Sequence, residues 1–124
     1  MNFNTSPLFD KQIKKLSKKY QNIKSDLIYF LNSFDDNHQI ATTIKANLFK
    51  VRVKNSDKSC GKRGGYRIYY YLIDKNQTTH LLVIYDKSEI EKIDESILED
   101  SLLDLTSIVE TGRKHQTYAK INFT

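Results

Sequence analysis

Two stretches of alternating apolar and polar residues, joined by a glycine-rich loop, most limit the folds open to this chain. The first, "FKVRVK" at residues 49–54, places an apolar side chain at every odd position and a cation at every even one. The second, "YRIYYYL" at residues 66–72, points Ile68, Tyr70 and Leu72 to one side and the residues between them to the other. A period of two is that of a β-strand, and a strand with one apolar face fits an antiparallel sheet that is covered on one side. The centre of the chain is therefore predicted to form such a sheet.

The neighbouring segments define a third strand and a loop. The run "HLLVIYDK" at residues 80–87 is apolar on both faces, which predicts a central strand. Residues 55–65 have the composition of a loop. Gly64 and Gly65 are expected to end this loop, because glycine readily adopts positive φ.

Helical periodicity precedes these strands. Ser6 and Pro7 form a helix start, because serine is a good capping residue and proline is tolerated in the first turn. The apolar spacing that follows predicts a first helix over about 7–20 and a second over about 24–34. The polar segment "DDNHQ" at residues 35–39 is expected to be a loop.

A further, acidic helix is expected to begin at Ser88 and to bury its isoleucine and leucine side chains on one face. The tail from about residue 105 carries no pattern that indicates a structure. A chain of 124 residues fits one domain, here 1–124. The predicted fold class is α+β, with two N-terminal helices packed on an antiparallel sheet and a C-terminal acidic helix.

The charged residues are unevenly distributed along the chain. Twenty lysines and arginines exceed fifteen aspartates and glutamates, which gives a formal net charge of +5. Residues 50–67 hold seven cations and one acid, whereas residues 86–104 hold eight acids and two cations. The predicted outer face of the sheet gathers both cations and tyrosines: Lys50, Arg52, Lys54, Arg67, Tyr69 and Tyr71. Cations neutralise phosphates and tyrosine rings stack on unpaired bases, so this face is predicted to bind nucleic acid. The alternative is an ordinary solvated face of a tyrosine-rich sheet.

Other features limit the location and the chemistry. No segment has the length of apolar sequence that a membrane span needs, and the first residues lack the apolar core of a signal peptide. Cys60 is the only cysteine, which fits a reducing compartment, so we expect a cytoplasmic protein. The three histidines, His38, His80 and His115, are far apart in the chain, and we expect no metal and no cofactor.

One family combines these features in the same order. The motif "GKRGGYRIYYY" at residues 61–71, followed by "LLVIYDK" at residues 81–87, resembles the toxins of RelE/HigB-type toxin–antitoxin pairs, a branch of the RelE/ParE superfamily. The resemblance covers about residues 50–95, and the two predicted helices before them fit the layout of the family. It implies a small α+β domain with a curved antiparallel sheet. It also implies cleavage of mRNA, typically on the ribosome, and neutralisation by an antitoxin protein.

The resemblance also assigns residues to the site. Arg67 matches the arginine after the glycines, and Lys87 lies in the matching motif at the end of a strand. Lys62 and Arg63 match the basic loop of the family. The cationic strand before the loop is matched by Lys50, Arg52 and Lys54. Tyr69 departs from the apolar residue expected at its position.

These residues suit RNA cleavage without a metal, in which the 2′-hydroxyl attacks the adjacent phosphorus. Arg67 is expected to stabilise the transition-state charge, helped by Arg63 or Lys62, because a planar guanidinium fits phosphate oxygens. The candidates for the general base are Lys87, Tyr85 and Tyr71. Side chains of these types ordinarily titrate near pH 10, well above neutrality.

Two other functions remain open at this point. Superfamily relatives of the ParE kind inhibit DNA gyrase without acting as nucleases. A module that binds RNA without cutting it would also use a basic and aromatic face.

Overall fold

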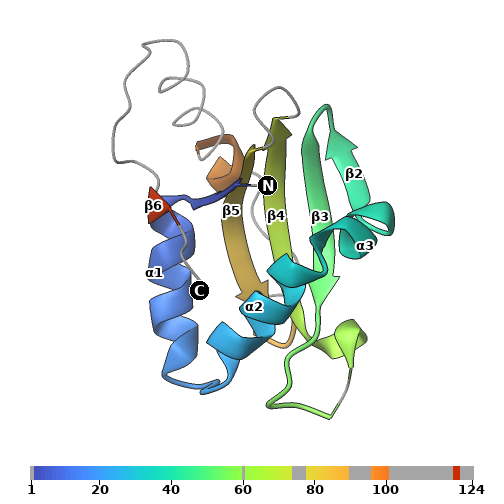
Figure 1. The fold of residues 1–124 in the computed structure, drawn as a ribbon. Helices are drawn as coiled ribbons and strands as arrows, with labels where there is room; N and C mark the ends of the chain where they lie inside the picture. The colour runs from blue at the N-terminus through green and yellow to red at the C-terminus, as the bar shows by residue number, and fades with distance from the viewer. Residues whose placement is uncertain (1, 60, 74–77, 90–95, 101–118, 121–124) are drawn as a thin grey trace.

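The computed structural model describes residues 2–59, 61–73, 78–89, 96–100 and 119–120, which form an α+β arrangement (Figure 1). The strands are β1 (Asn2–Thr5), β2 (Thr42–Lys45), β3 (Leu48–Val53), β4 (Tyr66–Ile73), β5 (Thr78–Asp86) and β6 (Ala119–Lys120). The helices are α1 (Pro7–Ser17), α2 (Ile23–Asn32), α3 (Phe34–Gln39) and the 3-10 turn η1 (Lys62–Gly64). Residues 96–100 form a further short helix.

All the described strands belong to one sheet, in the order β2-β3-β4-β5-β1-β6. β4 lies antiparallel between β3 and β5, with Arg67 opposite Arg52 on one side and Tyr85 on the other. The three predicted strands and the interior position of β5 are confirmed. The sheet is mixed rather than purely antiparallel, because β1 runs parallel to β5. The sequence of β1, "NFNT", has a single apolar residue and so carries no periodic signal.

The start of α1 is confirmed in detail. The Ser6 hydroxyl accepts a hydrogen bond from the Phe9 amide at 3.0 Å, and Pro7 is the first helical residue. The same hydroxyl donates to the carbonyl of Leu82 at 2.7 Å, which fixes the helix start to β5. α1 and α2 end at Ser17 and Asn32, short of the predicted limits.

Residues 35–39, predicted to be a loop, belong to α3. The Asn37 amide donates to the carbonyl and the hydroxyl of Ser33, both at 2.9 Å. Phe34 and Asn37 are buried, and the Phe34 ring packs edge-on against Tyr70 of β4. The prediction failed because this short helix depends on packing against the sheet, which its polar sequence does not reveal.

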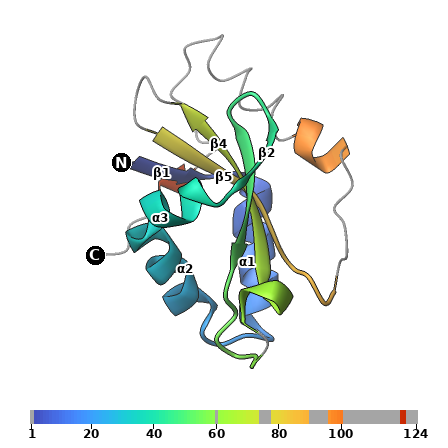
Figure 2. The same ribbon diagram turned by 90° about the vertical axis from the view of Figure 1, so that its right-hand side faces the viewer.

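The main core lies between the helices and one face of the sheet (Figure 2). It includes Phe9 of α1 and Phe30 of α2, which are fully buried. From the sheet it includes Ile68 and Tyr70 of β4, so the predicted alternation is confirmed for these two residues, whereas Leu72, predicted on the same face, is half-buried and outside this core.

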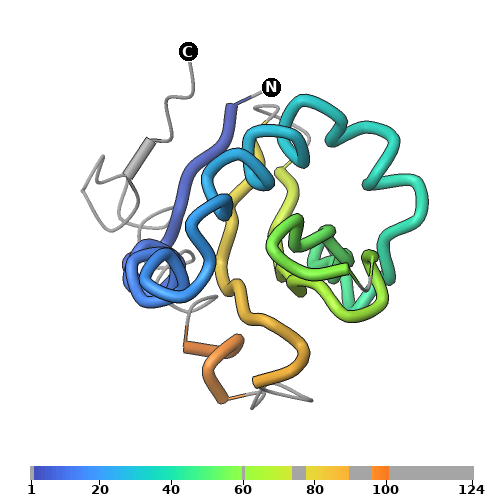
Figure 3. The backbone as a smooth tube through the Cα atoms, turned by 90° about the horizontal axis from the view of Figure 1, so that it is seen from below, coloured from blue at the N-terminus to red at the C-terminus, as the bar shows by residue number. Residues whose placement is uncertain are grey.

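The second face of the sheet is buried over part of its area, contrary to the prediction of an open face. Tyr69, Tyr85, Leu82 and Leu48 form a second apolar cluster there, together with Leu98 of the 96–100 helix. Figure 3 shows this helix and α2 on opposite sides of β5. A β-bulge opposite Tyr69 and Tyr70 places additional apolar surface of β5 on this face. That surface needs a cover, which the short helix provides.

The segment after β5 departs from its prediction. Ser88 lies in a turn over residues 87–89 rather than at a helix start. Its amide and hydroxyl both bind the Asp86 carboxylate. Of the expected acidic helix, residues 96–100 are helical and residues 90–95 lie outside the described chain. Cys60 and the tail lie outside it too, except for residues 119–120, which pair with β1.

Candidate nucleic-acid interface

Five cations line one groove on the surface of the protein. The groove has a volume of about 640 Å³, and we call it the cationic groove. Its cations are Lys50, Arg52, Lys62, Arg67 and Lys87. No carboxylate lines it among the described residues, so its charge is uniformly positive. All five belong to the predicted site, and the structure brings them together.

The cations come from four separate parts of the chain. β3 contributes Lys50 and Arg52, β4 contributes Arg67, η1 contributes Lys62, and the turn after β5 contributes Lys87. The lining also includes two exposed apolar residues, Ile40 and Ile44, with exposed fractions of 69% and 44%. Ile44 belongs to the edge strand β2 and Ile40 precedes this strand, which sequence reasoning did not connect to the site.

The glycine-rich loop fits closely against the end of β3, and this close approach explains why residue 65 is a glycine. Gly65 has φ of −88°, so the predicted positive φ at the end of the loop is wrong. A Cβ at Gly65 would lie 2.2 Å from the carbonyl oxygen of Val53, so the position requires glycine for close approach. The positive φ, +64°, occurs at Gly61 instead. The Gly65 carbonyl accepts from the Lys87 amide at 3.1 Å, which places Lys87 beside the loop.

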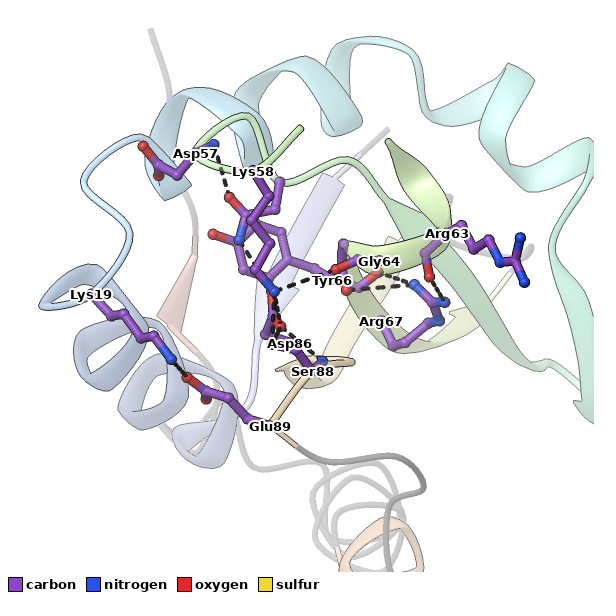
Figure 4. A network of polar contacts seen from close by, with 12 residues as sticks. Lys19, Asp57, Lys58, Arg63, Gly64, Tyr66, Arg67, Asp86, Ser88 and Glu89 are labelled. Carbon is purple, nitrogen blue, oxygen red and sulfur yellow. Dashed lines mark hydrogen bonds and ion pairs between the residues drawn. The ribbon is translucent and has the colours of Figure 1, made fainter. Parts of the chain in front are cut away.

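Arg67 is buried, with 3% of its surface exposed, and the expectation of an exposed strand residue is wrong. Its guanidinium donates to the carbonyls of Arg63 at 2.7 Å and Lys62 at 3.0 Å (Figure 4). It also contacts the carbonyls of Tyr66 at 3.2 Å and Gly65 at 3.5 Å. Burial, and then the nearby Arg52, lower the pKa of Arg67. An arginine remains charged in proteins, so Arg67 contributes its charge to the groove while its donors hold the loop.

A buried polar network at the end of β5 anchors the same loop from the other side (Figure 4). The Asp86 carboxylate is fully buried and accepts from Lys58 Nζ at 2.5 Å and Asn55 Nδ2 at 3.1 Å. Ser88 donates to it through both its amide and its hydroxyl. Burial raises the pKa of Asp86, but the hydrogen bonds from Lys58, Ser88 and Asn55 outweigh this effect and lower it. Sequence reasoning missed this network, since residues 55, 58 and 86 share no motif.

The predicted tyrosines lie outside the groove. Tyr69 and Tyr85 are buried, and their rings stack with centroids 6.4 Å apart. Lys50 Nζ lies 5.6 Å from the Tyr69 centroid, so Tyr69 supports a groove cation instead of offering a free face to a base. Burial raises the pKa of Tyr85, although Tyr69 and Arg67 act in the opposite direction. The raised pKa makes the deprotonated form, which would have to accept a proton, harder to reach. Tyr71 is partly buried beside the same cluster.

Lys54 and Arg63 are also placed apart from the cationic groove. Lys54 follows the end of β3 and lines a separate hollow against α2. Arg63 lines a shallow hollow with Gly64, Lys87 and Ser88. Both hollows adjoin the groove, because Lys62 lines the first and Lys87 the second.

The described histidines are part of the packing. His38 Nδ1 lies 2.6 Å from the Tyr70 hydroxyl, and its ring stacks on Phe34. His80 is buried in β5, and burial lowers its pKa to about 4. The described residues contain no group of three histidine, cysteine or acidic side chains that could hold a metal ion.

No model of a known protein family matches the chain. None of the helices in the described part of the chain combines the length and the apolar composition needed to cross a bilayer.

Proposed function

We propose that this protein binds single-stranded RNA in the cationic groove and cleaves it, as an mRNA interferase toxin of the RelE/HigB type. One observation carries the proposal: five cations from four parts of the chain line a single groove with no carboxylate among them.

The electrostatics of the groove favour a polyanion. Like charges held close together repel one another, and a fold gains nothing from collecting them. A bound chain of phosphates reverses the sign of these interactions and releases counterions. The exposed apolar side chains of Ile40 and Ile44 in the lining provide surface for bases, which a small inorganic anion would not use.

Cleavage would proceed by attack of a ribose 2′-oxygen on the adjacent phosphorus. The P–O bond to the 5′-oxygen of the next nucleotide breaks, and a cyclic phosphate forms. Lys50, Arg52 and Lys62 would neutralise charge on the phosphorane oxygens. Of the three base candidates, only Lys87 lines the groove, so we assign it removal of the 2′-hydroxyl proton, which it can return to the 5′-oxygen as that oxygen leaves. Arg67 acts by its charge and by holding the loop.

The wider context of the proposal is a toxin–antitoxin pair. The motifs at residues 61–71 and 81–87 resemble those of the family, and helices on one face of the sheet are compatible with a RelE/ParE-like fold. We propose that the substrate is mRNA on the ribosome, in the cytoplasm. The antitoxin would place an acidic or amphipathic segment over the cationic groove.

The test is to map RNA 5′ ends in a translation extract supplied with the purified protein. We expect discrete new ends in mRNA, reduced by about a hundredfold or more in Lys87→Ala if this residue transfers the proton. Lys24→Ala, an exposed lysine on α2 outside the groove, is the matched control. Breaks in double-stranded DNA would instead support gyrase poisoning, and RNA binding without new ends would support a module that does not cut.

A further inference from the structure

A second hollow opens beside the cationic groove, between α2 and the loop that follows β3. Its volume is about 540 Å³, within the usual range of ligand sites, and we call it the α2 hollow. Phe30 and Val53 are buried residues of its lining, and Tyr29 and Lys54 are exposed ones. The function proposed above makes no use of this site.

Tyr29 is the most unusual residue of the hollow. It is 75% exposed, more than any other large apolar side chain in the described part of the chain. The next residue, Phe30, is 1% exposed and belongs to the core. Tyr29 therefore presents an aromatic ring to solvent from a helix whose opposite side is firmly packed, and a single exposed aromatic ring is a stacking surface that suits any base.

Charged side chains line the same hollow as the Tyr29 ring. Lys54 and Lys62 line the same hollow, against the single carboxylate of Asp26. That carboxylate accepts a hydrogen bond from the Ser56 amide at 2.9 Å, so it fixes the loop that forms the wall. Two cations and an exposed ring supply the two kinds of contact that single-stranded nucleic acid needs.

The hollow shares one lining residue, Lys62, with the cationic groove. Lys62 lines both, and its ammonium lies 3.4 Å from the Asn37 Oδ1. Asn37 is itself held by two hydrogen bonds to Ser33. Lys62 is therefore positioned at the junction, where the phosphate between two neighbouring nucleotides would lie.

We propose that the α2 hollow is a nucleotide subsite for the same single-stranded RNA that occupies the cationic groove. Tyr29 stacks on the base of a nucleotide flanking the groove, and Lys54 and Lys62 bind the phosphates on either side of it. This inference rests on the proposed function of the groove, because the RNA must already lie there to reach the hollow.

The experiment is a titration of the full chain with a fluorescently labelled, unstructured RNA decamer, followed by anisotropy. We expect Tyr29→Ala to raise the Kd by about fivefold to a hundredfold, the usual range for loss of one stacked base, and Tyr29→Phe to leave it within about twofold. Lys54→Ala should weaken binding and lower the slope of log K against log salt by about 0.7, whereas Tyr29→Ala should leave the slope unchanged. Asn32→Ala, an exposed change on the same helix outside the hollow, is the control.

The outcomes separate the two proposals. If Lys50→Ala with Arg52→Ala weakens RNA binding but Tyr29→Ala does not, the subsite is wrong and the groove stands. If neither change weakens binding, the proposed function fails and the subsite with it. If Tyr29→Ala weakens binding to a protein partner and leaves the RNA Kd unchanged, the hollow is a protein-docking surface and the subsite is overturned. Photocross-linking of 4-thiouridine RNA to the peptide that contains Tyr29 would support the proposal directly.

Discussion

Arg67 directs its guanidinium at four carbonyl groups of residues 62–66, a segment that contributes Lys62 to the cationic groove. The charged side chain fixes the backbone conformation of this loop, because each buried carbonyl of a tight loop needs a hydrogen-bond donor. The positions of Lys62 and Arg63 in η1 depend on it directly. The influence of Arg67 on the groove is therefore as much geometric as electrostatic.

We expect Arg67→Ala to lower the free energy of unfolding by about 2–3 kcal/mol, because it leaves buried carbonyls without donors. Arg67→Lys should restore only part of this loss, since a single ammonium cannot reach all four oxygens. Arg63→Ala, at an exposed neighbour, should change stability by less than about 0.5 kcal/mol. Urea unfolding measures all three. Equal stabilities of Arg67→Ala and the parent would show that the guanidinium does not organise the loop.

Two glycines of the same loop make a second test, because they differ in what excludes a side chain. Gly65→Ala brings a Cβ to 2.2 Å from the Val53 oxygen and 2.9 Å from the Asn55 nitrogen, so backbone must move. We expect a loss of about 2 kcal/mol or more, with weaker RNA binding because Lys87 hydrogen-bonds to Gly65. Gly61→Ala meets no atom within 4 Å and should lose only the roughly 1 kcal/mol cost of a positive φ. A reversed order of the two losses, measured by urea unfolding, would contradict this packing.

His80 makes stability depend on pH. Burial lowers its folded-state pKa to about 4 from an ordinary value of 6.5, so between these values the unfolded chain binds more protons. Stability from this group is complete above about pH 6.5 and is lost as the pH falls toward 4. We expect a loss of about 2 kcal/mol between pH 7 and pH 5 that is absent in His80→Gln. Urea unfolding at the two pH values provides the measurement, and the same loss in the variant would assign it to other groups.

At the scale of elements, the loop between β3 and β4 is held at both ends by buried polar contacts. Arg67 holds the end near β4, while Asp86 binds Asn55 and Lys58 near the end of β3. The Asp86 carboxylate is fully buried, and Lys58 is the charge that compensates it. The end of β5 and the loop therefore form one unit.

Removal of Lys58 tests this unit. We expect Lys58→Met to cost about 2–3 kcal/mol, less than for a fully buried pair because the Lys58 side chain is 21% exposed. The loss should shrink in the background of Asp86→Asn, which removes the buried charge that Lys58 compensates. Lys24→Met is the control for removal of an exposed lysine. Additive effects of the two changes in a double-mutant cycle would show that Lys58 and Asp86 act independently.

Elements with a strong periodic signal were predictable, and those that depend on packing were not. The alternation in β3 and β4 places Val51 and Ile68 in the core as expected, because a strand with one buried face must alternate. β1 and α3 lack such a signal: β1 pairs through its backbone with β5, and α3 is fixed by Phe34 and Asn37. The beginning of α1 was predictable because Ser6 and Pro7 act through local chemistry.

At the scale of the whole molecule, the grouping of the groove cations was predictable, but the exposure of their neighbours was not. Alternation and the run of lysines and arginines already placed Lys50, Arg52 and Arg67 on one face. Burial of Tyr69 depends on the bulge in β5 and on the helix that contributes Leu98, and Arg67 is held by the carbonyls of Lys62 and Arg63; all of these are tertiary features. The exposed ring of Tyr29 lies on a different element, and no pattern in the sequence links it to the groove.

The charge of the groove predicts how RNA binding depends on salt. The guanidinium of Arg67 donates its hydrogen bonds to carbonyls of the loop. The groove cations that remain to contact phosphates directly are Lys50, Arg52, Lys62 and Lys87. Each phosphate neutralised on a single strand contributes about −0.7 to the slope of log K against log salt, so the four groove contacts give about −3, and a fifth contact from Lys54 in the α2 hollow would bring the slope to about −3.5. Anisotropy titrations between low and physiological salt measure this slope for the parent and for Arg52→Ala, in which it should flatten by one contact. The control is Lys24→Ala, whose lysine lies on α2 away from the groove and should leave the slope unchanged. A slope near zero would mean that the groove does not bind the RNA backbone, whatever the affinity.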